Sequence, residues 1–387
     1  MLRNRILVGL LFILSLVGIS VYGGPITYGF FIMVTLLPIT SAVYLLCVRV
    51  RFRIYQRLEG KTFVSNHAIP YYFTLQNEAK FAFAGVRVFF YSDYSTVFGL
   101  ADGAEYELFP ETGITRDTML FCKYRGHYTV GIKSVEITDF LRILRIRYKN
   151  REPLEVTVNP DTVVLPSLRS LTSSRAIAVD ALRGTSIPDM TVREYRTDDS
   201  FRRIHWKASA KAQQLMVRNV TGEEQKGVSV VLSTYRFASD PAVFLPVENR
   251  MLEITLALTH FFLLRGTPVH ACHRTDAFSE NVIDGTPSFD AYYSVLSALP
   301  FSDACADGLL FSDIGRQPSV SETKTAFLVL NRWDAEAEQL CRTWNAGGVP
   351  VVAYIVSKET PDFAAAASLP RTDCIVIPPD APLKEVL

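Results

Sequence analysis

The stretch ILVGLLFILSLVGISVYGGPITYGFFIMVTLLPITSAVYLLCV, Ile6–Val48, contains no Lys, Arg, Asp, Glu or His. A membrane-spanning helix needs about 20 apolar residues, so this stretch is long enough for two. Gly23-Gly24-Pro25 interrupts it near the middle, where two glycines and a proline disfavour a continuous helix. The sequence therefore predicts a transmembrane helical hairpin in residues 1–50, with helices at about 6–22 and 26–48.

Basic residues flank both ends of this hairpin, and none lies in its turn. Arg3 and Arg5 precede the first helix, and five basic residues follow the second: Arg49, Arg51, Arg53, Arg57 and Lys61. By the positive-inside rule, both ends of the hairpin and the main body are expected on the cytoplasmic side of the cell membrane. The alternative is a cleaved signal peptide. The second apolar segment and the lack of a small-residue cleavage motif argue against it.

The charge balance of the chain limits the partners it can bind. Lys and Arg number 40 and Asp and Glu number 39, which leaves a formal charge of +1 over 387 residues. Nucleic-acid binding through bulk charge is therefore not expected, and any basic function must be local. The six cysteines are scattered without paired spacing, so the sequence predicts neither a disulfide framework nor a zinc ribbon.

The body shows two successive patterns. Residues 51–165 contain short aromatic and β-branched segments, at 71–75, 86–91, 128–132 and 135–137, which predict a β-sandwich-like all-β domain. In residues 226–387, apolar strands alternate with helices, which predicts an open, mostly parallel α/β sheet. The strands are expected at 227–232, 268–274, 325–330, 351–356 and 374–377, and the helices at 249–265, 289–299, 334–345 and 362–369. Asn249 and Asp334 stand at cap-like positions.

Residues 166–225 are predicted to link the two domains, and they contain the distinctive segment 192–218. Its first part reads VREYRTDDSFRRIHWKASAK, Val192–Lys211, in which Asp199 or Ser200 could cap a short helix. One interpretation is a basic, Trp-bearing face for an acidic partner, a phosphate or a lipid headgroup. The favoured interpretation is an interdomain clasp in which the charges pair internally and Trp206 is packed. The candidate residues are Arg193, Glu194, Tyr195, Asp199, Arg202, Arg203, His205, Trp206 and Lys207.

This segment resembles the signature of the domain of unknown function 58 family, through Arg193-Glu194-Tyr195, Asp199, 202–210 and 215–218. The segments 124–128 and 139–141 resemble the family's Arg-Gly-x-Tyr strand and Asp-Pro-Phe-Gly turn, without its Pro and Gly. Asp198 stands where the family usually has Gly. The resemblance implies a hairpin anchor, a β-rich region and a von Willebrand factor A-like domain. It also implies association with MoxR-type AAA+ ATPases and transglutaminase-like membrane proteins.

The resemblance makes one metal position testable. Von Willebrand factor A-like domains often hold Mg²⁺ with Asp-x-Ser-x-Ser after their first strand, whereas this chain has Ser233-Thr234-Tyr235-Arg236-Phe237. The carboxylate is missing, Arg236 adds a repelling charge, and Asn331 replaces a possible acid after a later strand. We therefore expect no metal and no cofactor here. Since ligands of such sheets bind at the carboxyl ends of the strands, 233–236 with 331–333 is the expected protein contact.

Two classes of function remain open. The favoured one is a non-catalytic, membrane-anchored interaction or scaffold protein whose α/β domain docks partners, such as a MoxR-type AAA+ ATPase. The alternative is a membrane-bound metal-dependent or hydrolytic enzyme with ligands from distant loops, for instance Asp284, Asp303, Asp307 and Asp313. Turn carboxylates are more commonly solvated. His270, Cys272 and His273 alternate along one strand, which favours a packed cysteine and a surface histidine over a nucleophile.

Overall fold

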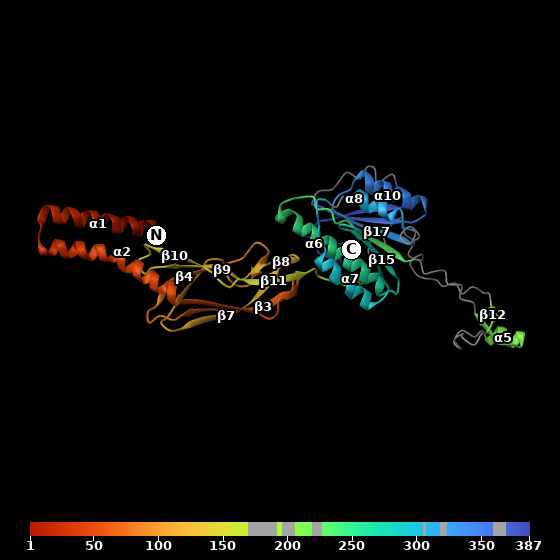
Figure 1. Cartoon of the computed structure of the whole chain (residues 1–387), viewed down its shortest axis with the longest axis horizontal. Helices are drawn as coiled ribbons and strands as arrows, with labels where there is room; N and C mark the ends of the chain where they lie inside the picture. The colour runs from red at the N-terminus through yellow and green to blue at the C-terminus, as the bar shows by residue number, and fades with distance from the viewer. Residues whose placement is uncertain (169–191, 196–205, 219–226, 305–306, 318–322, 359–368) are drawn as a thin grey trace. The chain divides into compact units, whose positions relative to one another are not determined.

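The computed structural model describes residues 1–168, 192–195, 206–218, 227–304, 307–317, 323–358 and 369–387 (Figure 1). The chain divides into two compact units, Met1–Asp161 and Thr162–Leu387, here called unit 1 and unit 2. The signature segment belongs to unit 2. Its residues 196–205, which include Asp199, Arg202, Arg203 and His205, lie outside the described part.

Unit 1 begins with two antiparallel apolar helices, as the sequence predicts. Helix α1 spans Leu2–Tyr22 and α2 spans Pro25–Arg51, so both are a few residues longer than expected. Gly23 takes the left-handed conformation with φ of 54° and donates its N–H to the carbonyl of Ile19, which ends α1. Both helices are long and apolar enough to cross a membrane, and few of their side chains are buried in the protein.

Helix α2 continues directly into the β-rich part of unit 1. It ends at Arg51, and strand β1 begins at Phe52. Leu45 and Val48 of α2 are buried in the same core cluster as Phe52. The Tyr44 hydroxyl donates to the carbonyl of Ala82 at 3.0 Å. The end of α2 is thus packed into the β-rich part rather than joined to it by a linker.

Two four-stranded sheets and one three-stranded sheet form the rest of unit 1. Their strand orders are β1-β3-β7-β5, β10-β9-β4-β6 and β2-β11-β8. All pairings are antiparallel except that of β2 with β11. The strands are β1 (Phe52–Leu58), β2 (Thr62–Val64), β3 (Ala68–Asn77), β4 (Phe83–Phe90), β5 (Ser95–Val97), β6 (Ala104–Leu108), β7 (Gly113–Cys122), β8 (Gly126–Val130), β9 (Ile132–Thr138), β10 (Arg145–Lys149) and β11 (Leu154–Asn159).

Side chains from the two four-stranded sheets meet in one hydrophobic core. Burial alternates along β3, where Tyr71, Phe73 and Leu75 point inward, and Val86 and Val88 of β4 belong to the same cluster. The predicted β-rich domain is therefore present. The expected segments 71–75 and 135–137 lie inside β3 and β9, 86–91 ends one residue past β4, and 128–132 is divided between β8 and β9 at Gly131.

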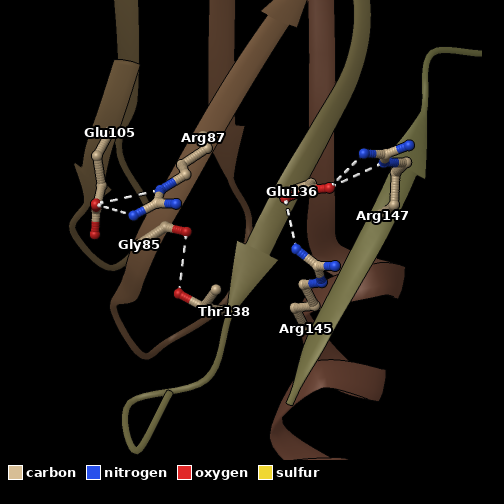
Figure 2. Close-up of polar contacts among 7 residues, drawn as sticks. All are labelled: Gly85, Arg87, Glu105, Glu136, Thr138, Arg145 and Arg147. Carbon is tan, nitrogen blue, oxygen red and sulfur yellow. Dashed lines mark hydrogen bonds and ion pairs between the residues drawn. The ribbon is translucent and has the colours of Figure 1, made fainter. Parts of the chain in front are cut away.

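Strand β4 contains a bulge at Gly85, where its register with β6 shifts (Figure 2). Gly85 has a φ of +65°, and its carbonyl accepts a hydrogen bond from the Thr138 hydroxyl at 3.3 Å. A Cβ atom at this position would lie 2.1 Å from that hydroxyl oxygen. Both the backbone conformation and the close approach of β9 therefore require glycine here.

Unit 2 contains a six-stranded sheet in the order β16-β15-β14-β17-β18-β19. Five strands are parallel, and the edge strand β16 is antiparallel to β15. The strands are β14 (Val228–Leu232), β15 (Val269–Arg274), β16 (Phe278–Ile283), β17 (Thr325–Leu330), β18 (Val351–Val356) and β19 (Thr372–Ile377). The predicted mostly parallel α/β sheet is confirmed.

Helices cover both faces of this sheet. Helices α6 (Pro241–Leu263) and α7 (Thr286–Ala298) contribute to one core cluster, and α8 (Asp307–Ile314) and α10 (Ala335–Ala346) contribute to the cluster on the other face. A short helix, α11 (Leu383–Val386), follows the last strand. Counting strands along the chain, the order is 3-2-1-4-5-6, which is that of a doubly wound α/β sheet.

Several expected elements of unit 2 differ from those observed. Helix α6 begins at Pro241, not near 249, because Asp240 accepts the N–H of Ala242 at 2.9 Å and caps it. Asn249 is buried inside the helix, so its predicted capping role is wrong. Asp334 does cap α10, accepting the N–H of Ala337 at 2.9 Å. Strand β16 and helix α8 were not predicted, and most of the predicted helix 362–369 lies outside the described residues.

Candidate functional site

The strand order of unit 2 places the candidate site at the carboxyl ends of β14 and β17. The chain leaves β14 toward β15 on one side, whereas β17 lies on the other side, so the connections diverge at this point. Ligands of doubly wound sheets bind at such switch points, and the carboxyl-end edge of the sheet at this point is called the crevice below. Ser233 follows β14 directly, and Asn331 follows β17. The N–H of Ser233 donates to the carbonyl of Val329 at 3.0 Å, which extends the parallel pairing into the crevice.

A buried serine and a buried aspartate meet at the base of this crevice. The Ser233 hydroxyl donates to Oδ1 of Asp307 at 2.6 Å, and both residues are buried. Asp307 is the first residue of α8, where a carboxylate is favoured by the helix dipole. Burial nevertheless raises the pKa of Asp307 to about 6, against the opposing effects of the Ser233 hydrogen bond and Arg332.

The position of Asp307 corrects one expectation from the sequence. Asp284, Asp303, Asp307 and Asp313 were expected to be solvated turn carboxylates, but Asp307 is buried and Asp313, also on α8, pairs with Arg274. Asp284 and Asp303 are exposed. The described residues contain no cluster of three or more His, Cys, Asp or Glu side chains that could hold a metal ion, so these carboxylates do not form a common ligand set.

Aromatic and arginine side chains form the wall of the crevice beside Asp307. The Arg332 guanidinium lies 4.1 Å from the centre of the Tyr235 ring. Its Nε is 3.3 Å from the carboxylate of Asp334 and 3.9 Å from that of Asp307. Asn331 donates its amide N–H to the carbonyl of Tyr235 at 2.6 Å, which fixes the loop after β14 to the end of β17.

Arg236 is held by α6 instead of pointing into the crevice as a free charge. Its guanidinium donates to Glu248 at 2.7 and 3.1 Å in a bidentate pair, and it lies 3.9 Å from the centre of the Phe244 ring. Glu248 is buried, so the pair neutralises a carboxylate in the interior. The expectation that Arg236 would repel a cation in the crevice is therefore wrong, because its charge is already compensated.

The side chains at the expected metal position fit a hard cation poorly. The Ser233 hydroxyl is already donated to Asp307, and the Thr234 hydroxyl is donated to the carbonyl of Arg274. The Arg332 guanidinium lies within 4 Å of the carboxylates of both Asp307 and Asp334. A Mg²⁺ ion at this place would have to displace these hydrogen bonds and compete with a guanidinium for the same oxygen.

Two polar atoms in this wall have no hydrogen-bond partner among the described residues. They are Oδ1 of Asn331 and Nε1 of Trp333, and both are buried. Buried polar atoms are nearly always paired, with protein or with water. These two atoms are therefore exceptions to that rule, and both lie in the segment directly after β17.

The signature segment forms a small structure of its own in the described part. Strands β12 (Val192–Glu194) and β13 (Met216–Arg218) pair antiparallel, and helix α5 (Trp206–Ala212) lies between them in sequence. The Ser209 hydroxyl accepts the N–H of Met216 at 2.8 Å, which fixes α5 to β13. The N–H of Tyr195 donates to the carbonyl of Leu215 at 2.8 Å.

The described part of this segment has one internal side-chain pairing and an exposed tryptophan. Glu194 accepts a hydrogen bond from the amide of Gln214 at 2.9 Å. Trp206 is 69% exposed and Lys207 is also exposed. The interdomain clasp with a packed Trp206 stays a prediction. A possible role for Asp199, Arg202, Arg203 and His205 stays a prediction.

The cysteine and histidines of β15 are packed or paired. Cys272 is fully buried, and burial raises the pKa of its thiol, which makes it a poor nucleophile. Nδ1 of His270 lies 2.9 Å from Glu280 of β16. His273 is buried on the opposite face, and burial lowers its pKa, so the predicted surface position of that histidine is wrong.

Comparison with known proteins agrees with the signature. Residues 191–283 match the family described as "Protein of unknown function DUF58", which supports the resemblance seen in the signature segment. The match begins at β12 and ends with β16, so it includes the crevice residues after β14 but not those after β17. No curated protein matches the chain.

Solved structures give only distant similarity. The matches include an inactive mutant of the GH20 exo-β-N-acetylglucosaminidase from Vibrio harveyi, at 9% identity and a TM-score of 0.18, and the same enzyme in complex with N-acetylglucosamine, at 11% and 0.17. Each alignment covers 83% of this chain and 59% of the enzyme. At these scores the similarity carries no argument about fold or function.

Proposed function

We propose that this chain is a membrane-anchored protein that docks a protein partner at the crevice of its α/β sheet. In this proposal α1 and α2 span the cell membrane, and the rest of the chain is cytoplasmic. The length and apolar surface of both helices support the anchor, and the basic residues after α2 support the orientation. Protease added to intact cells is expected to spare the body of the chain. Digestion of the body would contradict the orientation.

The arrangement of the crevice wall is the observation that carries the docking proposal. Arg332 stacks on Tyr235 and is also held by the carboxylate of Asp334, and Asn331 fixes the backbone of Tyr235. Arginine and aromatic side chains dominate the energetic centres of protein interfaces, and holding them in place lowers the entropy lost on binding. The wall therefore presents a pre-formed contact surface rather than a set of converging catalytic groups.

The family resemblance suggests the class of partner. We propose a von Willebrand factor A-like role for the α/β domain and a MoxR-type AAA+ ATPase as its partner, with a transglutaminase-like membrane protein as a further member of the assembly. A doubly wound sheet with a crevice at its switch point supports the first part. The partner would supply ATP hydrolysis, for which the sequence of this chain contains no recognisable nucleotide-binding motif.

A binding measurement with purified components tests the docking proposal. The full-length chain in detergent is immobilised, and the affinity of a purified MoxR-type AAA+ ATPase is measured by biolayer interferometry. Arg332→Ala is expected to weaken binding about tenfold, as a moderate interface hot spot does. Arg342→Ala on α10 is the matched control, because Arg342 is also exposed and is also paired with a carboxylate, that of Glu338. Equal effects of the two variants, or no binding by the wild type, would contradict the proposal.

The Ser233–Asp307 pair favours a second candidate, a hydrolytic enzyme. A buried carboxyl group with a raised pKa in a crevice is a common mark of a catalytic site. A screen with ester and phosphoester substrates tests this alternative on the full-length chain. Turnover that is lost in Asp307→Asn but kept in Asp303→Asn would support it, whereas absence of turnover in the wild type would count against it.

A further inference from the structure

Unit 1 contains a basic pocket where α2 meets the β-rich part. The pocket has a volume of about 310 Å³ and lies between the end of α2 and the edge strand β10. Four basic residues line it, Arg49, Arg147, Lys149 and Arg151, and no acidic residue does. Its size is at the lower end of the range for small-ligand pockets. Because β10 has a neighbour on one side only, half of its backbone polar groups face away from the sheet.

The positive charge of this region is only partly compensated within unit 1. Glu136 on β9 accepts from Arg147 at 2.6 Å and lies 3.6 Å from Arg145, so one carboxylate serves two guanidinium groups (Figure 2). Arg49, Lys149 and Arg151 have no carboxylate within 4.0 Å in the described part of the chain. Across residues 1–161, the sequence has 18 Lys and Arg against 13 Asp and Glu, whereas residues 162–387 have 22 against 26.

The pocket lies at the depth where α2 would leave the bilayer. Helix α2 has 27 residues and is therefore about 40 Å long, whereas the hydrocarbon core is about 30 Å thick. If the apolar span begins at Ile26, about 20 residues bring it to Leu45. Arg49, in the last turn of α2, then falls in the headgroup layer.

The loop between β9 and β10 is attached to the start of α1, close to the expected boundary of the bilayer. The side chains of Asn4 and Arg5 at the start of α1 donate to the carbonyls of Leu141 and Ile143, both at 2.7 Å. Phe140 in this loop is exposed, and its ring centre lies 5.7 Å from that of Tyr44 on α2. Exposed aromatic rings beside the ends of apolar helices are typical of the membrane interface. The loop and the basic pocket therefore both lie at the end of the hairpin where α1 begins and α2 ends.

We propose that the pocket between α2 and β10 binds the phosphate headgroup of an anionic membrane phospholipid. This inference rests on the proposed anchoring of the hairpin in the membrane. Arginine and lysine donors bind phosphate oxygens strongly, and clusters of such residues just cytoplasmic to a span bind anionic lipids. A lipid is favoured over a free phosphate because one of the basic residues, Arg49, belongs to the helix that crosses the bilayer.

Titration of the full-length chain tests this proposal. The protein in a neutral detergent is titrated by calorimetry with dihexanoyl-phosphatidylglycerol, dihexanoyl-phosphatidylcholine and inorganic phosphate. The wild type is expected to bind phosphatidylglycerol at least tenfold more tightly than the other two. Each basic residue near an anionic lipid contributes about fivefold in affinity, so Lys149→Gln with Arg151→Gln is expected to lose about 25-fold. The control, Arg57→Gln with Lys61→Gln, removes the same charge on exposed residues outside the pocket and is expected to change affinity less than twofold.

The results that overturn the inference are distinct from those that overturn the anchor. Equal binding of phosphatidylglycerol by the wild type and the pocket variant would overturn the lipid site. Binding of inorganic phosphate as tight as that of phosphatidylglycerol would assign the pocket to a free anion. Alkaline carbonate extraction of membranes reports the anchor separately, because a chain released into the soluble fraction would overturn the anchor whatever the titration gives.

Discussion

Replacing Asp307 by Asn removes a buried ionisable group and leaves a side chain of the same shape. The pKa of Asp307 is raised from 3.8 to about 6, so the native state holds its proton more tightly than the unfolded chain does. A tenfold change in proton binding corresponds to about 1.4 kcal/mol, so the difference amounts to about 3 kcal/mol. This stabilisation is complete below pH 3.8 and is lost as the pH rises through about 6.

The direction of this pKa shift determines how Asp307→Asn should differ from the wild type. Between pH 5 and pH 7.5 the unfolding free energy of the wild-type unit 2 should fall by about 1.5 kcal/mol relative to that of Asp307→Asn. Comparing the two proteins removes the opposite contribution of buried His273, whose lowered pKa makes the native state more stable as the pH rises. At pH 7.5 the variant should be more stable than the wild type by about 2 to 3 kcal/mol, because it buries no charge. Its amide oxygen can still accept the Ser233 hydrogen bond, whereas the loss of the favourable helix-dipole interaction reduces the gain.

Tryptophan fluorescence during urea unfolding measures this difference. All three tryptophans lie in residues 162–387, and Trp344 is buried against the sheet, so the signal reports unit 2. Asp303→Asn is the control, because Asp303 is exposed and close in sequence. An Asp307→Asn variant whose unfolding free energy changes between pH 5 and pH 7.5 by as much as that of the wild type would refute the reasoning.

Three further variants or treatments test other parts of the structure. Gly85→Ala should destabilise unit 1 by about 3 kcal/mol, seen as faster hydrogen exchange in β4. Gly99→Ala, where only the positive φ is unfavourable, should cost about 1 kcal/mol. Arg236→Ala should destabilise unit 2 by about 3 to 5 kcal/mol in the fluorescence assay, because it leaves Glu248 buried and unpaired, and adding Glu248→Gln should recover more than half of that loss. Cys272 should resist maleimide at pH 7 in the native chain and react after unfolding, as peptide mass spectrometry can show.

The sequence alone was sufficient to predict a helix or strand where one hydrophobic pattern runs through its whole length. The long apolar run with its Gly-Gly-Pro interruption predicts α1 and α2, and the continuous apolar strands of unit 2 predict the parallel sheet. Strand β16 escaped prediction because it is an edge strand with a half-exposed, polar sequence, Ser279-Glu280-Asn281 at its centre. The start of α6 was missed because Pro246, in the second turn of the helix, suggests a break.

The candidate site could be placed from the sequence, but its pairings could not. Ser233 and Asn331 follow apolar strands, and parallel strands end at the same edge, which is enough to predict the crevice. The hydrogen bond between Ser233 and Asp307 joins residues 74 positions apart, through a helix with no strong sequence signal. The pairing of Arg236 with Glu248 likewise depends on the start of α6 at Pro241, which is earlier than the start predicted from Asn249.

The near-zero total charge excluded bulk attraction to polyanions but not a local basic site. A total of +1 is the sum of a surplus of basic residues in residues 1–161 and a surplus of acidic residues in the remainder. In unit 1, Glu105 and Glu136 each serve two arginines, so carboxylates are outnumbered on the sheet formed by β10, β9, β4 and β6. Interactions between exposed charges are screened beyond about 8 to 10 Å at physiological salt. A headgroup in the β10 pocket would therefore respond to the neighbouring arginines of unit 1 and only weakly to more distant charges, so net charge per chain is the wrong quantity for predicting lipid contact.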